Sequence, residues 1–309
     1  MRSTSVISIF MMTFEQGGKV RIVFHPLAGR GVGRQRAQDL ASSLSAVGVD
    51  SELIDASYPI EKDHQRTPVG CRAIVVVGGD GLIHRTLPYI VGTRIPVGIL
   101  PAGSGNDLWR MLGHHNRAET FERIVSYCRH GGKTTKVDVL ELDFEDSVHS
   151  MKYAIGAVSW GAEAKINAAA NKLPRQLGAL RYIVGLLLSL PKLKSFYSTV
   201  STETLTFEGH ALAASIANIQ TLGGGIRLFP KSNFMDGTVE LSMVKGTRVL
   251  PVLPSLGKIL RGDSHRWKVS QQLSSAHVNT QQASYSDGEY VGTGNFDVRV
   301  LPGAIELID

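Results

Sequence analysis

The chain has 309 residues and a formal net charge of +6 at pH 7, and its length suits two domains rather than one small core. Apolar residues make up 43% of it, which excludes a disordered protein. No run of 18 uncharged apolar residues occurs, so we expect no membrane-spanning helix. The positive balance suits anionic partners such as nucleotides or a membrane surface, and a generally basic proteome would give the same balance.

Residues 1–18 contain a short apolar run whose flanks do not fit a signal peptide. We interpret them as a disordered leader or an upstream start, with folding beginning near Lys19. Cys71 and Cys128 make neither a disulfide framework nor a metal-binding spacing, which favours a reducing cytoplasm. The ten histidines show no zinc-binding spacing, and we expect no zinc site.

Strand and helix patterns alternate over residues 19–135. The predicted strands are Val20–Phe24, Ser51–Asp55, Ala73–Val77 and Val97–Leu100, and the predicted helices are Arg36–Val47, Leu82–Val91 and Arg117–Cys128. Apolar runs bounded by glycine are typical of buried parallel strands. The alternation predicts a doubly wound parallel α/β domain over residues 19–135.

After Gly131-Gly132 the pattern changes to short strands with alternating polarity, interrupted by one helical stretch from Glu163 to about Leu190. The predicted strands are Lys136–Leu142, Met151–Val158, Thr199–Phe207, Ala211–Ile219, Gly237–Val244, Trp267–Leu273, Ala276–Asn279 and Phe296–Val300. This spacing predicts a mainly β sandwich or partly open barrel over residues 136–309. The extreme C-terminus could return to the first domain.

Two glycine-rich loops follow predicted strands of the first domain, at Gly78-Gly79-Asp80-Gly81 and at Gly103-Ser104-Gly105. Each exposes backbone N–H groups where the chain turns into a helix, which is the arrangement that binds phosphate. Asp80 could be a turn residue. A carboxylate beside phosphate repels it unless the acid holds a metal or accepts a proton, so the pair of loops favours phosphoryl transfer. The Gly29-x-Gly31-x-Gly33 run is a weaker phosphate signal, and a loop with left-handed residues explains it equally well.

Several kinase and nucleotide-binding motifs are absent from the sequence. It has no GxxxxGK[ST] loop, no HRDxxxxN or DFG motif, and no dinucleotide fingerprint. These absences exclude P-loop proteins and protein kinases.

Two acidic turns lie in the second half, at Asp236-Gly237 and at Asp287-Gly288-Glu289. Each is compatible with an ordinary hairpin turn. The two carboxylates of the second turn could act as a base and a metal ligand if they face a phosphate. The stretch Lys165–Lys194 is basic and rich in leucine, which is compatible with a helix on anionic lipid or with a core helix that has one solvated face.

Taken together, these residues resemble the diacylglycerol kinase catalytic family of lipid kinases, which includes soluble bacterial diacylglycerol kinases and sphingosine and ceramide kinases. The resemblance spans about Val20 to Ile308. The matching segments are Phe24-His-Pro-Leu-Ala-Gly-Arg-Gly31, Gly78–Gly81, Pro101-Ala-Gly-Ser-Gly-Asn-Asp107, Gly223–Gly225 with Pro230 and Asp236-Gly237, and Asp287–Glu289. This set in this order is specific for the superfamily but does not name the lipid.

The resemblance implies an α/β domain like that of NAD kinases and diacylglycerol kinases, with ATP and Mg²⁺ in the cleft between two domains. The positions it implies for ATP binding are His25, Gly29, Gly78, Gly79, Asp80, Gly81, Leu82, Ile83, His84, Gly103, Ser104 and Asn106. It implies catalytic roles for Asp80, Asp287 and Glu289, with Glu289 as the proton acceptor. It also implies a separate structural Mg²⁺ around Asn233, Asp236 and Thr238.

Three positions depart from the family pattern. Arg85 stands where the family usually has an acid, His25 replaces an asparagine, and Asp55 or Ser57 stands in place of a threonine. These departures could alter or abolish activity.

We expect an ATP- and Mg²⁺-dependent lipid kinase that is cytoplasmic and peripherally membrane-associated. Diacylglycerol is the first expected acceptor, and a sphingoid base or another lipid is the second. We expect no nucleic-acid partner, and both a monomer and a homodimer remain open. The competing interpretations are an NAD kinase, which shares the GGDG loop, and a catalytically degenerate nucleotide-binding regulator.

Overall fold

The protein is described by a computed structural model over residues 18–57, 70–103, 105–145, 152–162, 165–166, 169–170, 172–173, 177, 180–222 and 226–309. The expected leader, apart from Gly18, lies outside these residues. So do Ser104, Glu163 and the glycines 223–225. No helix in the described part of the chain is long and apolar enough to cross a membrane.

The N-terminal lobe is built on four parallel strands in the order β4-β3-β1-β2. They are β1 (Lys19–Phe24), β2 (Ser51–Asp55), β3 (Cys71–Gly78) and β4 (Pro96–Pro101). Residues Ala73 to Gly78 of β3 are all buried, as expected for a strand covered on both faces. The carboxyl ends of the four strands meet at one edge, which is where open α/β sheets bind ligands.

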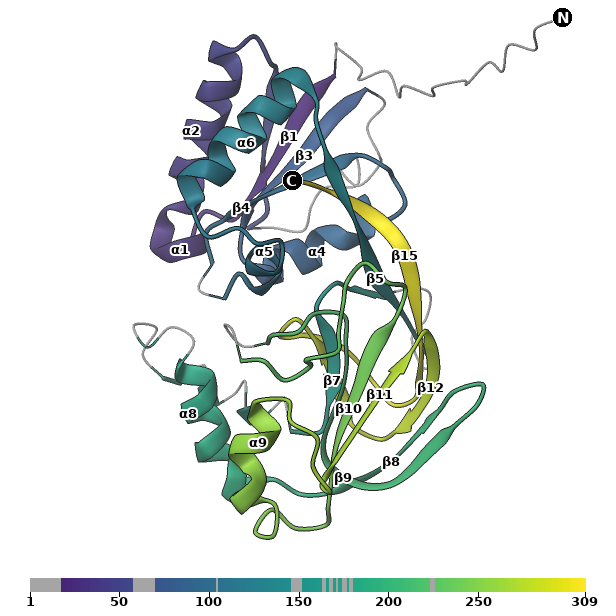
Figure 1. Ribbon diagram of the computed structural model, residues 1–309. Coiled ribbons are helices and arrows are strands. Elements are labelled where there is room, and N and C mark those ends of the chain that lie inside the picture. Colours follow the sequence, from purple (N-terminus) through teal and green to yellow (C-terminus); the bar gives the residue numbers. More distant parts are fainter. Residues whose placement is uncertain are drawn as a thin grey trace, which may run out of the picture.

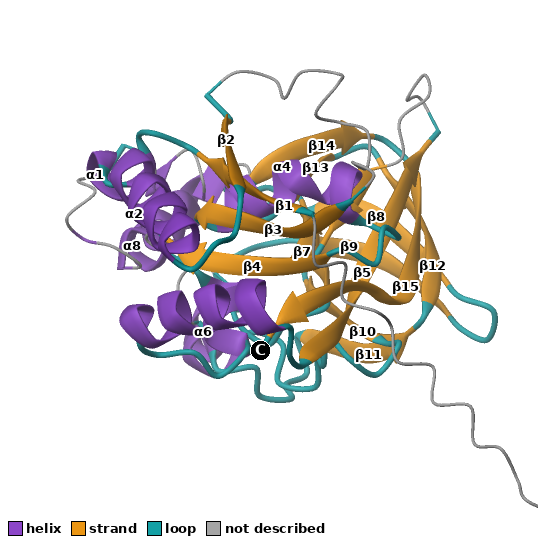
Figure 2. Cartoon of the chain, turned by 90° about the horizontal axis from the view of Figure 1, so that it is seen from above, coloured by secondary structure: helices purple, strands orange, loops and turns teal. Residues whose placement is uncertain are grey.

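Helices cover both faces of this sheet (Figures 1 and 2). They are α1 (Ala28–Gly31), α2 (Gly33–Ala46), α4 (Asp80–Ile90), α5 (Asp107–Met111) and α6 (Arg117–His130). Apolar residues of α2 and α6 share one core with β1 and β3, whereas those of α4 and α5 pack into a second core on the opposite face. Helix α4 follows β3 and helix α5 follows β4, so both helices begin at the ligand-binding edge.

The C-terminal lobe is mainly antiparallel and lies below the first lobe in Figure 1. Its strands are β5 (Thr134–Phe144), β6 (Lys152–Ala154), β7 (Ala157–Trp160), β8 (Phe196–Ser201), β9 (Thr206–Ala217), β10 (Val239–Lys245), β11 (Lys268–Leu273), β12 (Ser275–Thr280), β13 (Ala283–Ser286), β14 (Glu289–Thr293) and β15 (Phe296–Ile308). Its helices are α8 (Leu180–Ser189), η2 (Leu190–Lys192), η3 (Leu253–Ser255) and α9 (Leu256–Leu260).

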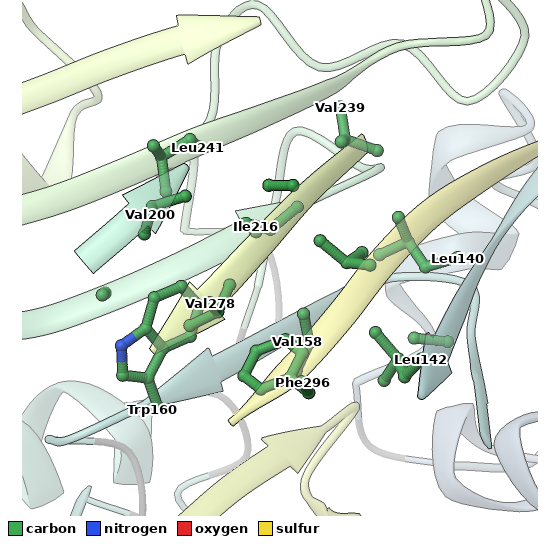
Figure 3. Packing of buried hydrophobic residues seen from close by; sticks show 14 of the residues in the cluster. Leu140, Leu142, Val158, Trp160, Val200, Ile216, Val239, Leu241, Val278 and Phe296 are labelled. Atoms are coloured by element: carbon green, nitrogen blue, oxygen red, sulfur yellow. The ribbon is translucent and has the colours of Figure 1, made fainter. Parts of the chain in front are cut away.

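Aromatic residues organise the core of this lobe (Figure 3). Trp160 and Phe296 are buried completely and meet edge to face, with ring centroids 5.6 Å apart. Phe144 stacks on Phe296 at 4.8 Å. The Trp160 indole N–H donates to the Ser198 hydroxyl at 3.3 Å, which satisfies its one polar group inside the core. This packing fixes β7, β8 and β15 relative to one another.

Strand β15 connects the lobes. It pairs antiparallel with β5 and β12, and its last residues pair parallel with β4 through Glu306 and Leu307. One hydrogen-bonded sheet of 15 strands therefore runs through the described parts of both lobes. The expected fold class, a parallel α/β domain followed by a β-sandwich domain, is confirmed.

Two predicted strands are interrupted. The strand expected over Met151–Val158 is divided into β6 and β7 by Ile155 and Gly156. The strand expected over Thr199–Phe207 is two strands, β8 and β9, joined by a turn at 202–205. In that turn the Thr202 hydroxyl accepts from the Leu205 N–H at 3.0 Å. Threonine-rich sequence hides such a turn, because threonine is also a good strand former.

The long helix expected from Glu163 to Leu190 is not continuous. Among the described residues, Lys172 and Leu173 are a turn and a bend, and α8 begins at Leu180. Pro174 follows in the sequence, and proline disfavours the helical conformation at the residue before it. The hairpin β13–β14 and the helices α5 and α9 were not predicted.

Candidate active site

Two glycine loops meet at the carboxyl edge of the parallel sheet. Gly79 precedes α4, and Gly103 follows β4. A Cβ placed on Gly79 would lie 2.9 Å from the Gly103 Cα, and one on Gly103 would lie 2.6 Å from the Gly79 Cα. Only glycine permits this backbone approach, and it brings the start of α4 against the second loop.

Asn106 closes the second loop on itself. Its side-chain oxygen accepts from the Gly103 N–H at 3.1 Å, and its amide donates to the Gly103 carbonyl at 2.9 Å. It takes a left-handed conformation with φ of 53° and is buried. Asn106 therefore shapes the loop, and its contacts are with the chain itself.

Asp80, the first residue of α4, is half-buried beside the two loops, and its Oδ1 atom is fully buried. A Cβ on Gly105 would lie 2.7 Å from its Oδ2, and its Oδ1 has no hydrogen-bond partner among the described residues. Burial, together with the charges of Asp107 and Asp287, raises the pKa of Asp80 to about 7. An acid with a buried, unpaired oxygen is suited to hold a cation or a proton.

The second lobe supplies two more acids from the turn between β13 and β14. Asp287 and Gly288 have φ of 52° and 91°, the positive values that a two-residue type I′ hairpin requires. Ala157 N–H donates to Asp287 Oδ1 at 3.1 Å, and Ile155 N–H approaches Oδ2 at 3.4 Å. The backbone at the interruption between β6 and β7 therefore binds the Asp287 carboxylate. The expected turn is thus a hairpin turn and also faces the first lobe.

Glu289 begins β14 and lies against the start of α4. Its Oε1 is 3.3 Å from where a Cβ on Gly81 would stand, and the residue is exposed. Gly81 therefore leaves room for a carboxylate that comes from the other lobe.

His84 joins the two lobes directly. It lies one turn into α4, and its Nδ1 is 3.4 Å from both Asp287 Oδ2 and the Ser286 hydroxyl. Its side chain and that of Asp287 are 13% and 5% exposed, so water screens this contact little. The contact holds the acidic turn over α4.

One cavity of about 540 Å³ joins these groups to the interior of the second lobe. At one end, both glycine loops and the carboxylates of Asp80, Asp107, Asp287 and Glu289 line it. At the other end its walls are apolar and come from α8, η2, β9, β10, α9 and the segments before β10 and η3, including Leu186, Leu190, Leu212, Phe229, Val252 and Ile259. The cavity can thus hold a charged group and a hydrocarbon group together.

The expected nucleotide-binding residues are placed differently with respect to this cavity. Gly79, Asp80, Gly81, Ile83 and Gly103 line it. Leu82 instead packs into the core behind Gly78, and Ser104 lies outside the described residues. Asp107, which lines the cavity beside Asp80, was overlooked as a site residue although it ends the PAGSGND segment.

His25 follows β1 and Gly29 lies in α1, and neither residue lines the cavity. The His25 Nδ1 accepts from the Leu27 N–H at 3.2 Å. Gly29 has φ of 58°, and a Cβ there would meet the Ala102 carbonyl at 2.4 Å, so α1 packs directly on the start of the second glycine loop. Asp55, at the end of β2, accepts hydrogen bonds from Ser57 and Arg34.

The expected structural metal residues form a compact turn before β10. The Asp236 Oδ1 accepts from the Thr238 N–H and hydroxyl at 2.9 and 2.8 Å, and Asn233 accepts from the Met235 N–H. Asp138, which is buried, accepts from Gly237 N–H and Gly303 N–H. The turn lies outside the lining of the cavity, and its metal role stays a prediction.

Comparison with known proteins places the chain among lipid kinases. Residues 19–142 match a family model described as the diacylglycerol kinase catalytic domain, and residues 156–309 match one described as the YegS C-terminal NAD kinase beta sandwich-like domain. A diacylglycerol kinase of Mycobacterium tuberculosis is 25% identical over 301 residues, covering 94% of this chain and 95% of the relative. The protein named "Probable lipid kinase YegS" of Escherichia coli is 27% identical over 269 residues, covering 84% of each chain.

Solved structures share the fold. A diacylglycerol kinase from Bacillus anthracis superimposes with a TM-score of 0.68 at 20% identity, covering 94% of this chain and 96% of the other. The yeast NADH kinase complexed with NADH superimposes with a TM-score of 0.53 at 13% identity, covering 94% and 82%.

The raised pKa of Asp80 predicts how stability depends on pH. Folding raises this pKa from 3.8 to about 7, so the folded state holds the proton more tightly and stability falls as pH rises through this window. Between about pH 5 and about pH 8, the free energy of unfolding of wild type should fall by on the order of 2 kcal/mol relative to that of Asp80→Asn. Urea unfolding in the presence of a chelator measures this. Asp143→Asn, which changes an exposed carboxylate on β5, should run parallel to wild type. If the unfolding free energy of Asp80→Asn depended on pH in the same way as that of wild type, the raised pKa of Asp80 would be contradicted.

Proposed function

Because this chain belongs to the diacylglycerol kinase family of lipid kinases, we propose that it transfers the γ-phosphate of ATP to a hydroxyl group of a membrane lipid. The observation that carries the proposal is the single cavity with carboxylates and glycine loops at one end and leucines at the other. A lipid hydroxyl and a triphosphate must meet in such a place, because one substrate is mostly apolar and the other is an anion. We further propose residues 19–135 as the nucleotide-binding unit and residues 136–309 as the lipid-binding unit.

The triphosphate would lie on the glycine loops. Backbone N–H groups at the start of α4 and the positive end of its dipole favour anions there. Gly79, Gly81 and Gly103 keep side chains out of this space. His25, after β1, and Gly29, in the α1 helix that packs against Ala102, would contact the nucleotide farther from the lipid.

Mg²⁺ fits the unpaired Asp80 oxygen. Within the described residues, no three His, Cys, Asp or Glu side chains come together to hold a metal ion on their own. Mg²⁺ is commonly held by one or two carboxylates together with substrate phosphates, so Asp80, with Asp107 or Asp287 beside it, suits a metal that arrives with ATP. When bound, the ion would neutralise charge on the phosphate oxygens.

Glu289 is the group we propose as proton acceptor for the lipid hydroxyl. It lines the cavity beside Gly81 of the first glycine loop and comes from the lobe opposite Asp80. As the oxygen attacks the γ-phosphorus in line, the carboxylate takes its proton, and backbone N–H groups stabilise the phosphoryl oxygens. Asp287 does not need to react, because its two hydrogen bonds to β6–β7 backbone position the turn that carries Glu289.

Diacylglycerol is the leading acceptor. The leucine-lined end of the cavity suits a hydrocarbon chain, and its polar end suits a headgroup hydroxyl. Diacylglycerol and a single-chain lipid such as a sphingoid base both have these two parts. A relative named diacylglycerol kinase favours the first, and a single-chain lipid stays the second candidate.

An NAD kinase activity is less favoured by the same cavity. The nicotinamide and adenine groups are polar, and the leucine-lined end offers them few hydrogen-bond partners. We propose that the protein acts in the cytoplasm and associates peripherally with the membrane that holds its lipid, as a monomer or a homodimer.

The proposed catalytic acids can be tested with labelled ATP. Incubation with γ-labelled ATP, Mg²⁺ and a total lipid extract should yield one labelled lipid, which chromatography and mass spectrometry identify. Glu289→Gln and Asp80→Asn should lower turnover about 10²–10⁴-fold and leave the fold intact, because each removes a carboxylate charge from the site and keeps the size of the side chain. Asp143→Asn serves as the matched control.

Each other result would select a different function. Label on NAD and on no lipid would make the protein an NAD kinase. Tight ATP binding without transfer to any acceptor would make it a nucleotide-binding regulator. Unchanged turnover in Glu289→Gln would contradict its role as the base.

The apolar end of the cavity predicts a selective effect on the lipid. Ala213 lies on β9 in the cavity wall, and Ala213→Phe would fill space that the hydrocarbon needs. We expect the KM for a long-chain acceptor to rise about tenfold or more, with the KM for ATP unchanged. Ala213→Ser keeps the volume and should behave like wild type. Equal changes in both KM values would contradict a lipid-binding role for this wall.

The contact between His84 and Asp287 predicts a positioning effect. His84→Ala should lower kcat about tenfold because the acidic turn is no longer held over α4, and the KM for ATP should change little. His84→Asn retains a side-chain donor of similar reach and should restore most of the rate. His277→Ala is the matched control, since it removes another His–Asp pair, with Asp297 at 2.8 Å, on the exposed side of the second lobe. Equal losses in His84→Ala and His277→Ala would refute the positioning role.

A further inference from the structure

Helix α8 is apolar on two faces. Leu186 lines the cavity, and Leu190 lines it just beyond the end of α8. Leu180, Leu187 and Leu188 point outward and are 58%, 51% and 57% exposed. Together with Val184, these outward residues follow the i, i+4, i+7, i+8 spacing of one helical stripe. A helix on the surface of a soluble protein normally carries polar residues there, so this second stripe needs a partner.

A second segment adds to the same surface. Leu250 precedes η3 and is 77% exposed, and Leu253 is 38% exposed and also lines the cavity. Val252 and Ile259, from the same segment, line the cavity together with Leu186 of α8. Figure 1 shows α8 and α9 next to each other on one side of the second lobe. We call the set Leu180, Leu187, Leu188, Leu250 and Leu253 the leucine face.

The charge of the chain is concentrated in the two segments that carry the leucine face. Residues 165–194 contain six Lys or Arg and no acid, and residues 245–268 contain six Lys or Arg and one acid. Since the whole chain has an excess of only six positive charges, the remainder of the chain is net negative. Lys192, Arg248 and Lys258 are exposed in these segments.

We propose that the leucine face docks on an anionic membrane surface, with its leucines at the boundary of headgroups and acyl chains and its lysines and arginines on lipid phosphates. The biological purpose of this docking rests on the proposed function, whereas the test of the docking does not depend on it. Exposed leucines surrounded by cations are the composition of interfacial membrane-binding helices. A protein partner would not require the positive charge of the chain to gather in these two segments.

Docking in this orientation explains why the same two segments also wall the cavity. α8 and η3–α9 present leucines outward to the bilayer and inward to the lipid-binding space. An acceptor can then pass from the bilayer between them without exposing its chain to water, which removes the main free-energy barrier to loading an apolar substrate.

Vesicle flotation of the full chain without nucleotide tests the docking. The probes are phosphatidylcholine vesicles with and without phosphatidylglycerol. Leu187→Glu combined with Leu188→Glu, and separately Leu250→Glu, should lower the fraction bound to anionic vesicles about tenfold. Leu205→Glu is the matched control, because Leu205 is 46% exposed but lies in the β8–β9 turn, at the far end of β8 from η2.

A charge series gives an independent measurement. Lys192→Glu and Lys258→Glu should each weaken binding roughly fivefold or more, and high salt should weaken wild-type binding in the same direction. Lys133→Glu, an exposed lysine of the first lobe, should have no such effect. Circular dichroism confirms that each variant remains folded.

The outcomes separate docking from catalysis. Phosphorylation of lipid in vesicles should fall in the leucine variants, whereas phosphorylation of a short-chain acceptor dispersed in water should stay at the wild-type rate. If wild type binds anionic vesicles through the leucine face but labels no lipid, docking stands and the proposed function fails. Equal vesicle binding by wild type and the leucine variants would overturn the docking proposal. So would absence of wild-type binding to either vesicle, or a dimer in solution that the leucine substitutions dissociate in place of vesicle binding.

Discussion

The contact between the backbones of Gly79 and Gly103 is the constraint on which the site depends. With no side chain at either position, the start of α4 presses against the second loop, and one oxygen of the Asp80 carboxylate is fully buried. Burial beside Asp107 and Asp287 then makes ionisation of Asp80 costly, which is the electrostatic condition for capturing a cation or a proton. A larger residue in either loop would separate the two strands' ends and return the carboxylate to solvent.

The second lobe completes the site through an interruption in a strand. Ile155 and Gly156 break the strand continuity between β6 and β7, and the backbone N–H groups on either side of Gly156 turn to Asp287. A Cβ on Gly156 would come within 2.2 Å of Asp287 Oδ1, so this acid has a place only because the residue is glycine. The acids of the two lobes thus meet through backbone geometry on both sides, and His84 adds the side-chain contact between them.

Local patterns predicted the parts of the molecule that local forces determine. The strand over Ser51–Asp55 was predicted with its observed bounds, and the glycine loops were placed at the ends of β3 and β4, because apolar runs ended by glycine have few other solutions. The backbone hydrogen bonds that hold Asp287 could not be predicted, since they depend on a contact between residues about 130 positions apart. The inward and outward stripes of α8 were equally hidden, because leucine gives the same sequence pattern whether it faces a cavity or the surface.

Strand β15 determines how the lobes can move. Its ladder with β5 shifts register between Leu301 and Ile305, where Gly303 has φ of 57° and donates its N–H to the buried Asp138. Since paired strands rather than a loose tether join the lobes, any opening of the cleft has to flex this bulge while the hydrogen bonds on either side stay made. The connection then resists opening elastically and returns both lobes to one relative position. The acids of the two lobes therefore come back to the same arrangement after each opening.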